Sequence, residues 1–254
     1  MKKIKTIITT ALTIMLVNVF YFSGNTSIVA TSLDTRKHGY GQGKMVDGNN
    51  CPYGAIDFNS QYGQFDAYAL SDDKNAIILT FDQGYENGYT IPILDTLKEK
   101  NVTAIFFLTG DYAIKETKLV QRMIDEGHIL GNHGMTHASM PDLSVDECKA
   151  EIMDLHDYVL EKYNYEMQYL RPPCGEFSEV SLATTQDLGY KTLMWSYAYV
   201  DWQVDSQPSA SKALENLNGA AHGGGIYLLH SVSKTNSEII GEVIDSLRAK
   251  GYNL

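Results

Sequence analysis

The sequence predicts an α/β fold, a distorted (β/α) barrel of parallel strands preceded by an irregular N-terminal extension. From residue 75 onward, short runs of β-branched or apolar residues alternate with longer amphipathic stretches, and this alternation repeats six times. Polar residues of reactive types follow the ends of these apolar runs, which is where a barrel gathers its chemistry. Together the two observations indicate consecutive β/α units in a parallel sheet or barrel.

Residues 1–30 differ in composition from the rest of the chain. Lys2, Lys3 and Lys5 precede an apolar run over residues 7–22, and a polar stretch follows that run. This is the layout of a secretory signal peptide, and the run is short for a membrane span. We therefore expect export across the cytoplasmic membrane, with the segment either cleaved as a signal peptide or kept as an N-terminal anchor.

Residues 31–74 are rich in Gly, Asn, Asp, Ser and Tyr and show little periodicity, so we expect an irregular region that packs on the main domain. The main domain is expected to span residues 75–254. Its predicted strands lie at residues 76–81, 104–108, 129–131, 168–171, 191–196 and 225–230. Its predicted helices lie at residues 91–100, 117–127, 144–163, 178–188, 209–217 and 235–250.

Local signals mark several ends of these helices. Ser144 and Glu147 form a capping-box pattern at the start of the third helix, and Ser209, after a proline, suits the start of the fifth. Gly189 and Gly251 each follow an amphipathic run, where a residue with positive φ commonly ends a helix.

The overall charge and the cysteines narrow the class of protein. The formal net charge is -11 and the basic residues are scattered, so a nucleic-acid partner is excluded because its phosphates would be repelled. Cys51, Cys148 and Cys174 lie far apart and form no C-x-x-C metal pair. We expect no essential disulfide.

Residues suited to catalysis or metal binding follow the predicted strands. The segments that contain them include Asp82 and Gln83 after the first strand, His133 and His137 after the third, Arg171 and Cys174 at the fourth, Asp201 with the neighbouring Trp202 beyond the fifth, and His230 with the neighbouring Leu228 at the sixth. Each has an ordinary structural alternative, since a carboxylate can cap a helix, a histidine pair can lie on a helix surface and an arginine can serve an ion pair. Because five segments occupy equivalent positions, a single active site is the favoured interpretation.

These five segments resemble, in order, the five motifs of the polysaccharide deacetylase family, carbohydrate esterase family four. The resemblance covers residues 75–254. Within that family, residues 79–90, 195–196 and 200–202 are most similar to the delta-lactam-biosynthetic de-N-acetylases, which act on muramic acid in the spore cortex. The resemblance implies a distorted (β/α) barrel of the polysaccharide deacetylase type, with an active-site groove at its top.

The resemblance also implies which residues transfer protons. Hydrolysis of an acetamide requires an activated water, a stabilised oxyanion and a protonated amine leaving group. By similarity, Asp82 is the general base and Arg171 orients it. His230 is the general acid, and Asp201 keeps it protonated by favouring the imidazolium.

A substrate pocket and a metal site are implied in the same way. The backbone N–H of Cys174 completes an oxyanion hole, and Trp202 and Leu228 enclose the acetyl methyl group. His133 and His137 hold a divalent metal, with zinc expected.

Two positions depart from the family pattern. Most members carry an aspartate ligand at the position of Gln83, and a neutral amide oxygen binds a divalent cation more weakly, so we expect weak metal binding. The delta-lactam branch also tends to carry an amide there. Gly134 replaces the usual Ser or Thr after the first histidine. The chain stops at Leu254, where relatives commonly continue, which leaves the completeness of the last barrel element open.

By resemblance, the expected function is de-N-acetylation of muramic acid in the glycan strand of peptidoglycan, leading to muramic delta-lactam, with an amidase acting first to remove the stem peptide. The enzyme would then be secreted, associated with the cell wall or membrane-anchored. Two alternatives stay open: a metal-dependent deacetylase of N-acetylglucosamine in peptidoglycan or chitin-like chains, and a carbohydrate-binding protein without activity. The second is motivated by Gln83. No protein partner is implied.

Overall fold

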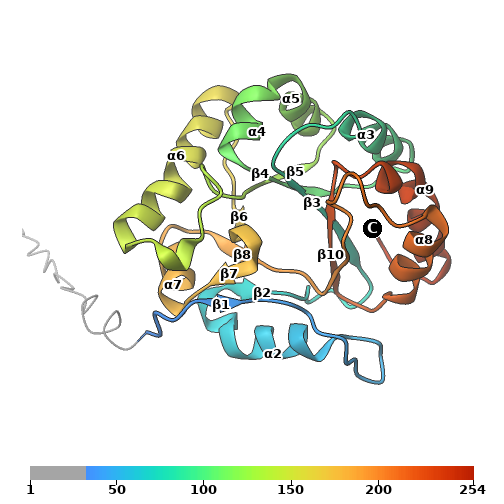
Figure 1. Cartoon of the computed structure of the whole chain (residues 1–254), viewed down its shortest axis with the longest axis horizontal. Coiled ribbons are helices and arrows are strands. Elements are labelled where there is room, and N and C mark those ends of the chain that lie inside the picture. The colour runs from blue at the N-terminus through green and yellow to red at the C-terminus, as the bar shows by residue number, and fades with distance from the viewer. Residues whose placement is uncertain (1–32) are drawn as a thin grey trace, which may run out of the picture. The chain divides into compact units, whose positions relative to one another are not determined.

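Eight parallel strands form a curled sheet that bends into a half-barrel (Figure 1). The computed structural model describes residues 33–254. The strands, in spatial order, are β2 (Ala67–Tyr68), β8 (Lys191–Leu193), β6 (Tyr169–Leu170), β5 (Ile129–Asn132), β4 (Ile105–Leu108), β3 (Ile77–Gln83), β10 (Gly225–His230) and β9 (Tyr197–Ala198). Since β2 and β9 do not pair with each other, the barrel stays open on one side.

The helices connect the strands and cover the outer face of the sheet (Figure 1). They are α3 (Thr90–Glu99), α4 (Gly110–Lys115), α5 (Thr117–Asp125), α6 (Val145–Tyr163), α7 (Glu179–Asp187), α8 (Ala210–Gly219) and α9 (Lys234–Ala249). The six predicted strands and six predicted helices are all present, so the predicted α/β barrel is confirmed. The short elements β2, β9 and α4 were not predicted.

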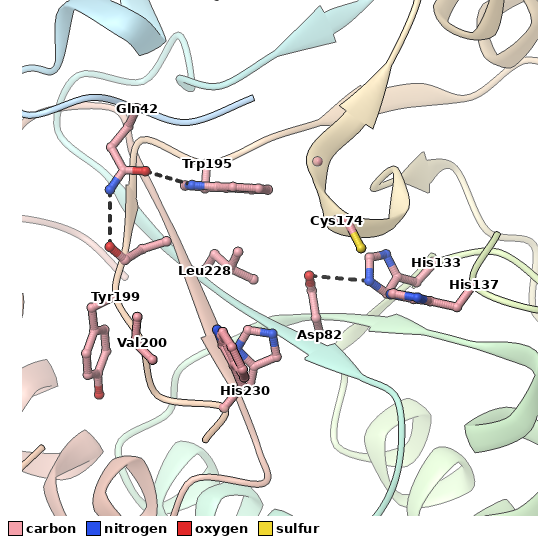
Figure 2. A pocket seen from close by; sticks show the side chains of 13 residues that line it. Gln42, Asp82, His133, His137, Cys174, Trp195, Tyr199, Val200, Leu228 and His230 are labelled. Atoms are coloured by element: carbon pink, nitrogen blue, oxygen red, sulfur yellow. Dashed lines mark hydrogen bonds and ion pairs between the residues drawn. The ribbon is translucent and has the colours of Figure 1, made fainter. Parts of the chain in front are cut away.

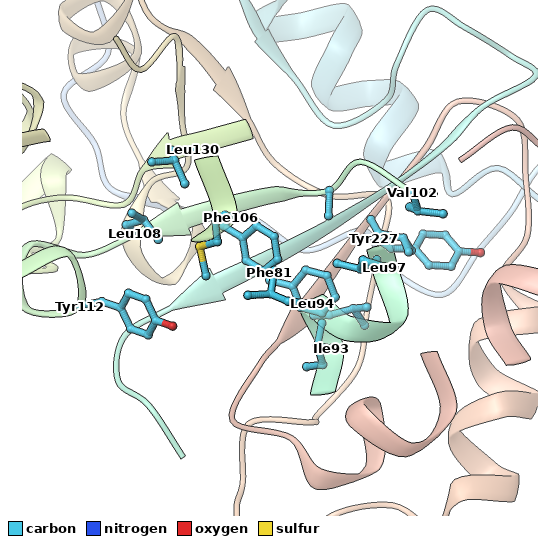
Figure 3. Close-up of a cluster of buried hydrophobic side chains, with 14 of the residues drawn as sticks. Phe81, Ile93, Leu94, Leu97, Val102, Phe106, Leu108, Tyr112, Leu130 and Tyr227 are labelled. Carbon is cyan, nitrogen blue, oxygen red and sulfur yellow. The ribbon is translucent and has the colours of Figure 1, made fainter. Parts of the chain in front are cut away.

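The alternation of side chains along the strands separates the core from the interior of the half-barrel. Phe81 and Phe106 point toward the helices, where their rings stack 5.2 Å apart within the main hydrophobic cluster (Figure 3). Phe107 belongs to a separate small cluster with residues of other strands. Because successive side chains of a strand face opposite ways, Thr80 and Asp82 lie on the face opposite to Phe81.

The predicted helix ends are observed. The Ser144 hydroxyl accepts from the Glu147 N–H while the Glu147 carboxylate accepts from the Ser144 N–H, which is a complete capping box. Ser209 caps α8 through the N–H of Lys212. Gly189 and Gly251 follow α7 and α9 with φ of +84° and +92°, values that favour glycine.

The N-terminal region is more ordered than its composition predicts. It contains α2 (Tyr53–Tyr62), the strand β2 of the main sheet, and β1 (His38–Gly39), which pairs antiparallel with β7 (Glu176–Phe177). The expectation of an irregular region is therefore wrong for these segments. The helix has no capping side chain and buries only Ala55 and Phe58, so its amphipathic pattern is too weak to read from the sequence. Tertiary packing stabilises it.

Other expectations concern the membrane and the cysteines. The predicted signal peptide lies outside the described residues. Within residues 33–254, none of the helices combines the length and apolar character needed to cross a bilayer. Cys51, Cys148 and Cys174 are all free thiols.

Candidate active site

A cavity of about 630 Å³ opens at the carboxyl ends of the strands and collects residues from all five predicted segments (Figure 2). Seven of the ten candidate residues line it: Asp82, His133, His137, Cys174, Trp202, Leu228 and His230. Of the other three, Arg171 and Asp201 are fully buried directly behind lining residues, and Gln83 lies elsewhere. A smaller cavity of about 260 Å³ adjoins the first and is lined by several of the same residues together with Tyr85 and Val232.

Arg171 fixes the carboxylate of Asp82 from behind. Its Nη1 donates to Asp82 Oδ1 at 2.7 Å and to Thr80 Oγ1 at 2.8 Å, and its other nitrogens donate to two backbone carbonyls. The guanidinium carbon lies 4.2 Å from the centroid of the Phe107 ring. Burial raises the pKa of Asp82, but the charges of Arg171 and the neighbouring histidines outweigh it and hold the pKa below its usual value. Asp82 is therefore an anion with a fixed orientation.

His230 is held in the same manner by Asp201. His230 Nδ1 lies 2.7 Å from Asp201 Oδ1, and the backbone N–H of His230 donates to Asp201 Oδ2 at 2.8 Å. A carboxylate only accepts, so Nδ1 carries a proton. Burial lowers the pKa of His230, but its hydrogen bond and charge interaction with Asp201 outweigh burial and raise the pKa. Asn236 Nδ2 donates to Asp201 Oδ2 at 2.6 Å and completes the support.

Asp82 and His230 come from neighbouring strands at the same level. They are register partners in the parallel pairing of β3 with β10, and both line the cavity. One side chain is prepared to accept a proton and the other to donate one, across a space open to a ligand.

The two histidines after β5 lie beside Asp82. His133 Nδ1 is 2.8 Å from the carbonyl oxygen of Arg171, so Nδ1 carries the hydrogen, and Nε2 lies 3.5 Å from Asp82 Oδ2. Burial lowers the pKa of His133 to about 4, so the imidazole is neutral near pH 7. The His137 ring lies 4.8 Å from that of His133, centroid to centroid, and its backbone φ is +62°.

Gln83 does not join these histidines in the cavity. Alternation along β3 turns it away from the face that carries Asp82, and its Nε2 donates to Ser231 Oγ at 2.5 Å. Its Oε1 is buried without a hydrogen-bond partner. Within residues 33–254, no three His, Cys, Asp or Glu side chains are grouped as metal ligands.

Comparison with known proteins places the chain in a family. The polysaccharide deacetylase family model matches residues 69–193. The chain is also 42% identical to the peptidoglycan-N-acetylmuramic acid deacetylase PdaA of Bacillus subtilis, over 76% of this chain and 74% of that protein. This chain belongs to the polysaccharide deacetylase family. It is therefore a deacetylase, a hydrolase of the carbohydrate esterase family four type.

Two further similarities agree with this membership. The deacetylase is 32% identical to a peptidoglycan-N-acetylglucosamine deacetylase of Bacillus cereus, over 73% of this chain and 68% of that protein. The solved structure of Bacillus subtilis PdaA, a family 4 carbohydrate esterase, superposes with a TM-score of 0.81 at 38% identity, covering 86% of this chain and 94% of that chain.

Deacetylases of this family are generally metal-dependent, and the residues present fit a divalent cation in part. His133 is a neutral imidazole whose Nδ1 is bonded to a backbone carbonyl, which leaves Nε2 as a lone-pair donor toward the cavity. His137 adds a second ring beside it. Two neutral nitrogens without Gln83 fall short of the three protein ligands of ordinary catalytic zinc sites.

Several residues of the deacetylase site were not predicted as functional. Gln42, Trp195 and Tyr199 line the cavity, and Asn236 supports Asp201. Trp195 lies within a segment that carries the family resemblance, so a signal for it existed. Gln42 lies in the region expected to be irregular, and no pattern in the sequence marks it.

Proposed function

We propose that this deacetylase removes the acetyl group from muramic acid residues of peptidoglycan. Its 42% identity to a peptidoglycan-N-acetylmuramic acid deacetylase supports this substrate. The observation that carries the chemistry is the facing pair of Asp82, bonded to Arg171, and His230, bonded to Asp201, at 2.7 Å in each case.

Asp82 acts as the general base. It takes a proton from a water molecule as the water oxygen attacks the acetamide carbonyl carbon, and Arg171 keeps the receiving carboxylate oriented. His230 acts as the general acid, donating the Nε2 proton to the amide nitrogen as the C–N bond breaks. Asp201 favours the imidazolium before this step. The products are acetate and the free amine.

Cys174 and two apolar side chains complete the pocket. Cys174 has a φ of +57°, a conformation that costs a non-glycine residue about 1 to 3 kcal/mol and that recurs at functional sites. We assign its backbone N–H to the oxyanion that forms on the acetyl oxygen. Trp202 and Leu228 line the same cavity and enclose the methyl group.

His133 and His137 would hold the divalent metal, for which zinc is the expected ion. A metal bound there supplies polarisation of the carbonyl and of the attacking water. Because His133 is neutral near pH 7, it is ready to bind a cation without first losing a proton. With two neutral nitrogens we expect weak binding.

The product of this reaction leads to a further step. The freed amine on muramic acid faces the 3-O-lactyl carboxyl, and their condensation gives a six-membered delta-lactam, a ring size that benefits from high effective molarity. This product belongs to spore cortex, and prior removal of the stem peptide by an amidase exposes the carboxyl. Such a substrate lies outside the cytoplasm, in agreement with the signal-like residues 1–30.

The second candidate is deacetylation of N-acetylglucosamine, favoured by the 32% identity to a deacetylase of that sugar. A non-catalytic carbohydrate-binding role is the third, and the prepared acid and base argue against it. The test is mass spectrometry of peptide-free glycan strands incubated with the enzyme. We expect loss of acetyl from muramic residues, with loss of water scored separately. Acetyl loss from glucosamine residues alone would favour a deacetylase of N-acetylglucosamine. If neither sugar loses acetyl, a non-catalytic carbohydrate-binding role would be favoured.

A further inference from the structure

The wall of the cavity includes a segment that lies outside the matched family region of residues 69–193. The backbone N–H of Tyr40 donates to the carbonyl of Gly175 at 2.9 Å, and its hydroxyl donates to the carbonyl of Trp195 at 2.5 Å. The rings of Tyr40 and Trp195 meet edge to face, 5.1 Å apart. Residues 40–42 therefore connect the loop that carries Cys174 with the loop that leads to Asp201.

Gln42 is held in one orientation at this wall. Trp195 Nε1 donates to Gln42 Oε1 at 2.8 Å, and Gln42 Nε2 donates to the carbonyl of Ala198 at 3.1 Å (Figure 2). An indole N–H can only donate and a carbonyl can only accept, so the two contacts fix which end of the amide is which. The amide nitrogen carries two hydrogens and uses one in these bonds. One donor of Gln42 is left for a ligand.

The position of Gln42 separates it from the reacting bond. Figure 2 shows Gln42 across the cavity from His133 and His137. The acetamide belongs beside Asp82 and His230 under the proposed function, so Gln42 faces another part of the sugar. A cavity of about 630 Å³ is far larger than an acetamide, which leaves space for a substituent on the neighbouring carbon.

The charges of the cavity wall restrict how such a substituent is recognised. Among the lining residues within 33–254 there is no Lys or Arg, and Gln42 is the only carboxamide side chain. Under the proposed function the His230 imidazolium faces the acetamide, so a carboxylate on the sugar at the Gln42 wall meets neutral donors instead. The lactyl group on O3 of muramic acid carries such a carboxylate, and glucosamine does not.

We propose that residues 40–42 are part of the substrate site and that Gln42 is a specificity-determining residue that favours the lactyl-bearing sugar by donating to its carboxylate. This inference rests on the proposed deacetylation of muramic acid. It assigns the choice between the two sugars to a residue of the N-terminal region.

The test is Gln42→Glu, which keeps the size of the side chain, removes the donor and adds a negative charge. We expect kcat/KM to fall about tenfold or more on a peptide-free glycan containing N-acetylmuramic acid, mainly through KM, because like charges then meet. On an oligomer of N-acetylglucosamine the fall should be about threefold or less. Gln61→Glu, an exposed residue of α2, is the matched control and should alter neither value.

An equal fall on both substrates, or no fall on either, would overturn the proposal. Gln42→Ala serves as the second variant if Gln42→Glu does not fold, with a smaller loss expected and the same bias toward the muramic substrate. Both tryptophans of the chain, Trp195 and Trp202, line this cavity, so tryptophan fluorescence measures binding of each oligomer without turnover. If the wild type cleaves neither sugar, the proposed function fails. If Gln42→Glu leaves the wild-type ratio of the two dissociation constants unchanged, the proposed role of Gln42 is wrong. This outcome is independent of whether the proposed function holds.

Discussion

At the residue scale, the two central side chains owe their opposite properties to their partners. Asp82 receives a hydrogen bond from a fully buried arginine, and His230 is bonded to a fully buried carboxylate. Both pairs lie in a site of low dielectric, where charge interactions are stronger than in water. The arrangement therefore makes one side chain a base and the other an acid through the charges of their partners.

The first prediction concerns these two residues. Asp82→Asn and His230→Ala should each lower kcat by a factor on the order of a hundred or more. The fold should persist, because an asparagine oxygen still accepts from Arg171, and circular dichroism will check this. Asp111→Asn, at an exposed ion pair with Lys115, is the control. Near-normal turnover in either variant would remove its assigned role.

The second prediction concerns the pH dependence of the rate. As pH increases, activity should first rise as Asp82 ionises, in a range below the ordinary aspartate pKa of about 3.9. It should then fall as His230 loses its proton, in a range above the ordinary histidine pKa of about 6.5. Asp201→Asn should move the falling limb to lower pH, since the imidazolium loses its anionic partner. Profiles of kcat/KM for both proteins will measure the limb. A limb that stays in place means that Asp201 does not tune His230.

The third prediction concerns the metal. Zinc should bind the wild type weakly, with activity partly lost to a chelator and regained on adding metal. His133→Ala should lose binding, whereas Gln83→Asp should bind zinc as weakly as the wild type, because alternation along β3 turns residue 83 away from the two histidines. Isothermal titration of zinc into the three proteins compares them. Wild-type affinity in His133→Ala would show that His133 is not a metal ligand, and a clear gain of affinity in Gln83→Asp would show that residue 83 reaches the metal.

At the scale of elements, the longer repeats could be predicted and the short elements could not. Strands such as β3 and β10 are mostly apolar and are buried on both faces, and a capping box marks the start of α6. By contrast, β2 and β9 have two residues each and depend on neighbours brought from elsewhere in the chain. Asp82 and His230 could be predicted because they lie at the ends of the long strands β3 and β10, whereas Gln42 is placed by tertiary contacts alone.

The fourth prediction tests whether α2 is an integral part of the fold. Phe58 is 3% exposed and packs against Tyr40 and Phe177, with ring centroids 4.9 and 5.4 Å away. Phe58→Ala should lower the free energy of unfolding by about 3 to 5 kcal/mol in chemical denaturation. Tyr53→Ala, at a position on α2 that is 46% exposed, should change it by about 0.5 kcal/mol or less. Similar small losses in both would mean that α2 packs only loosely.

At the scale of the whole described unit, parallel strands bring every catalytic candidate to one edge of the sheet. The carboxyl ends of β3, β5 and β10 face the same way, so Asp82, His133 and His230 meet although they are far apart in sequence. This arrangement places charged side chains in the interior, since Arg171 and Asp201 are fully buried. Such groups stabilise the fold only in the protonation states that their partners require.

The last prediction is how stability depends on pH. The pKa of Asp82 is lowered in the folded state, so its contribution is present above about pH 3.9 and is lost as pH falls through the folded pKa. The pKa of His230 is raised, so its contribution is fully present below about pH 6.5 and is lost as pH rises through the folded pKa. Together these two groups stabilise the fold most between about pH 4 and 6.5.

Asp201→Asn isolates the histidine contribution from all other titrating groups. The variant should lose more free energy of unfolding at about pH 6, where the wild-type His230 is charged and paired, than at a pH above the falling limb of the wild-type rate profile, where His230 is neutral in both proteins. Urea denaturation of both proteins at the two pH values, with a chelator present to remove bound metal, measures the difference. Asp111→Asn should give the same loss at both pH values. If Asp201→Asn also loses the same free energy of unfolding at both pH values, the Asp201 carboxylate does not stabilise the imidazolium. His230 would then lack the property that its role as general acid requires.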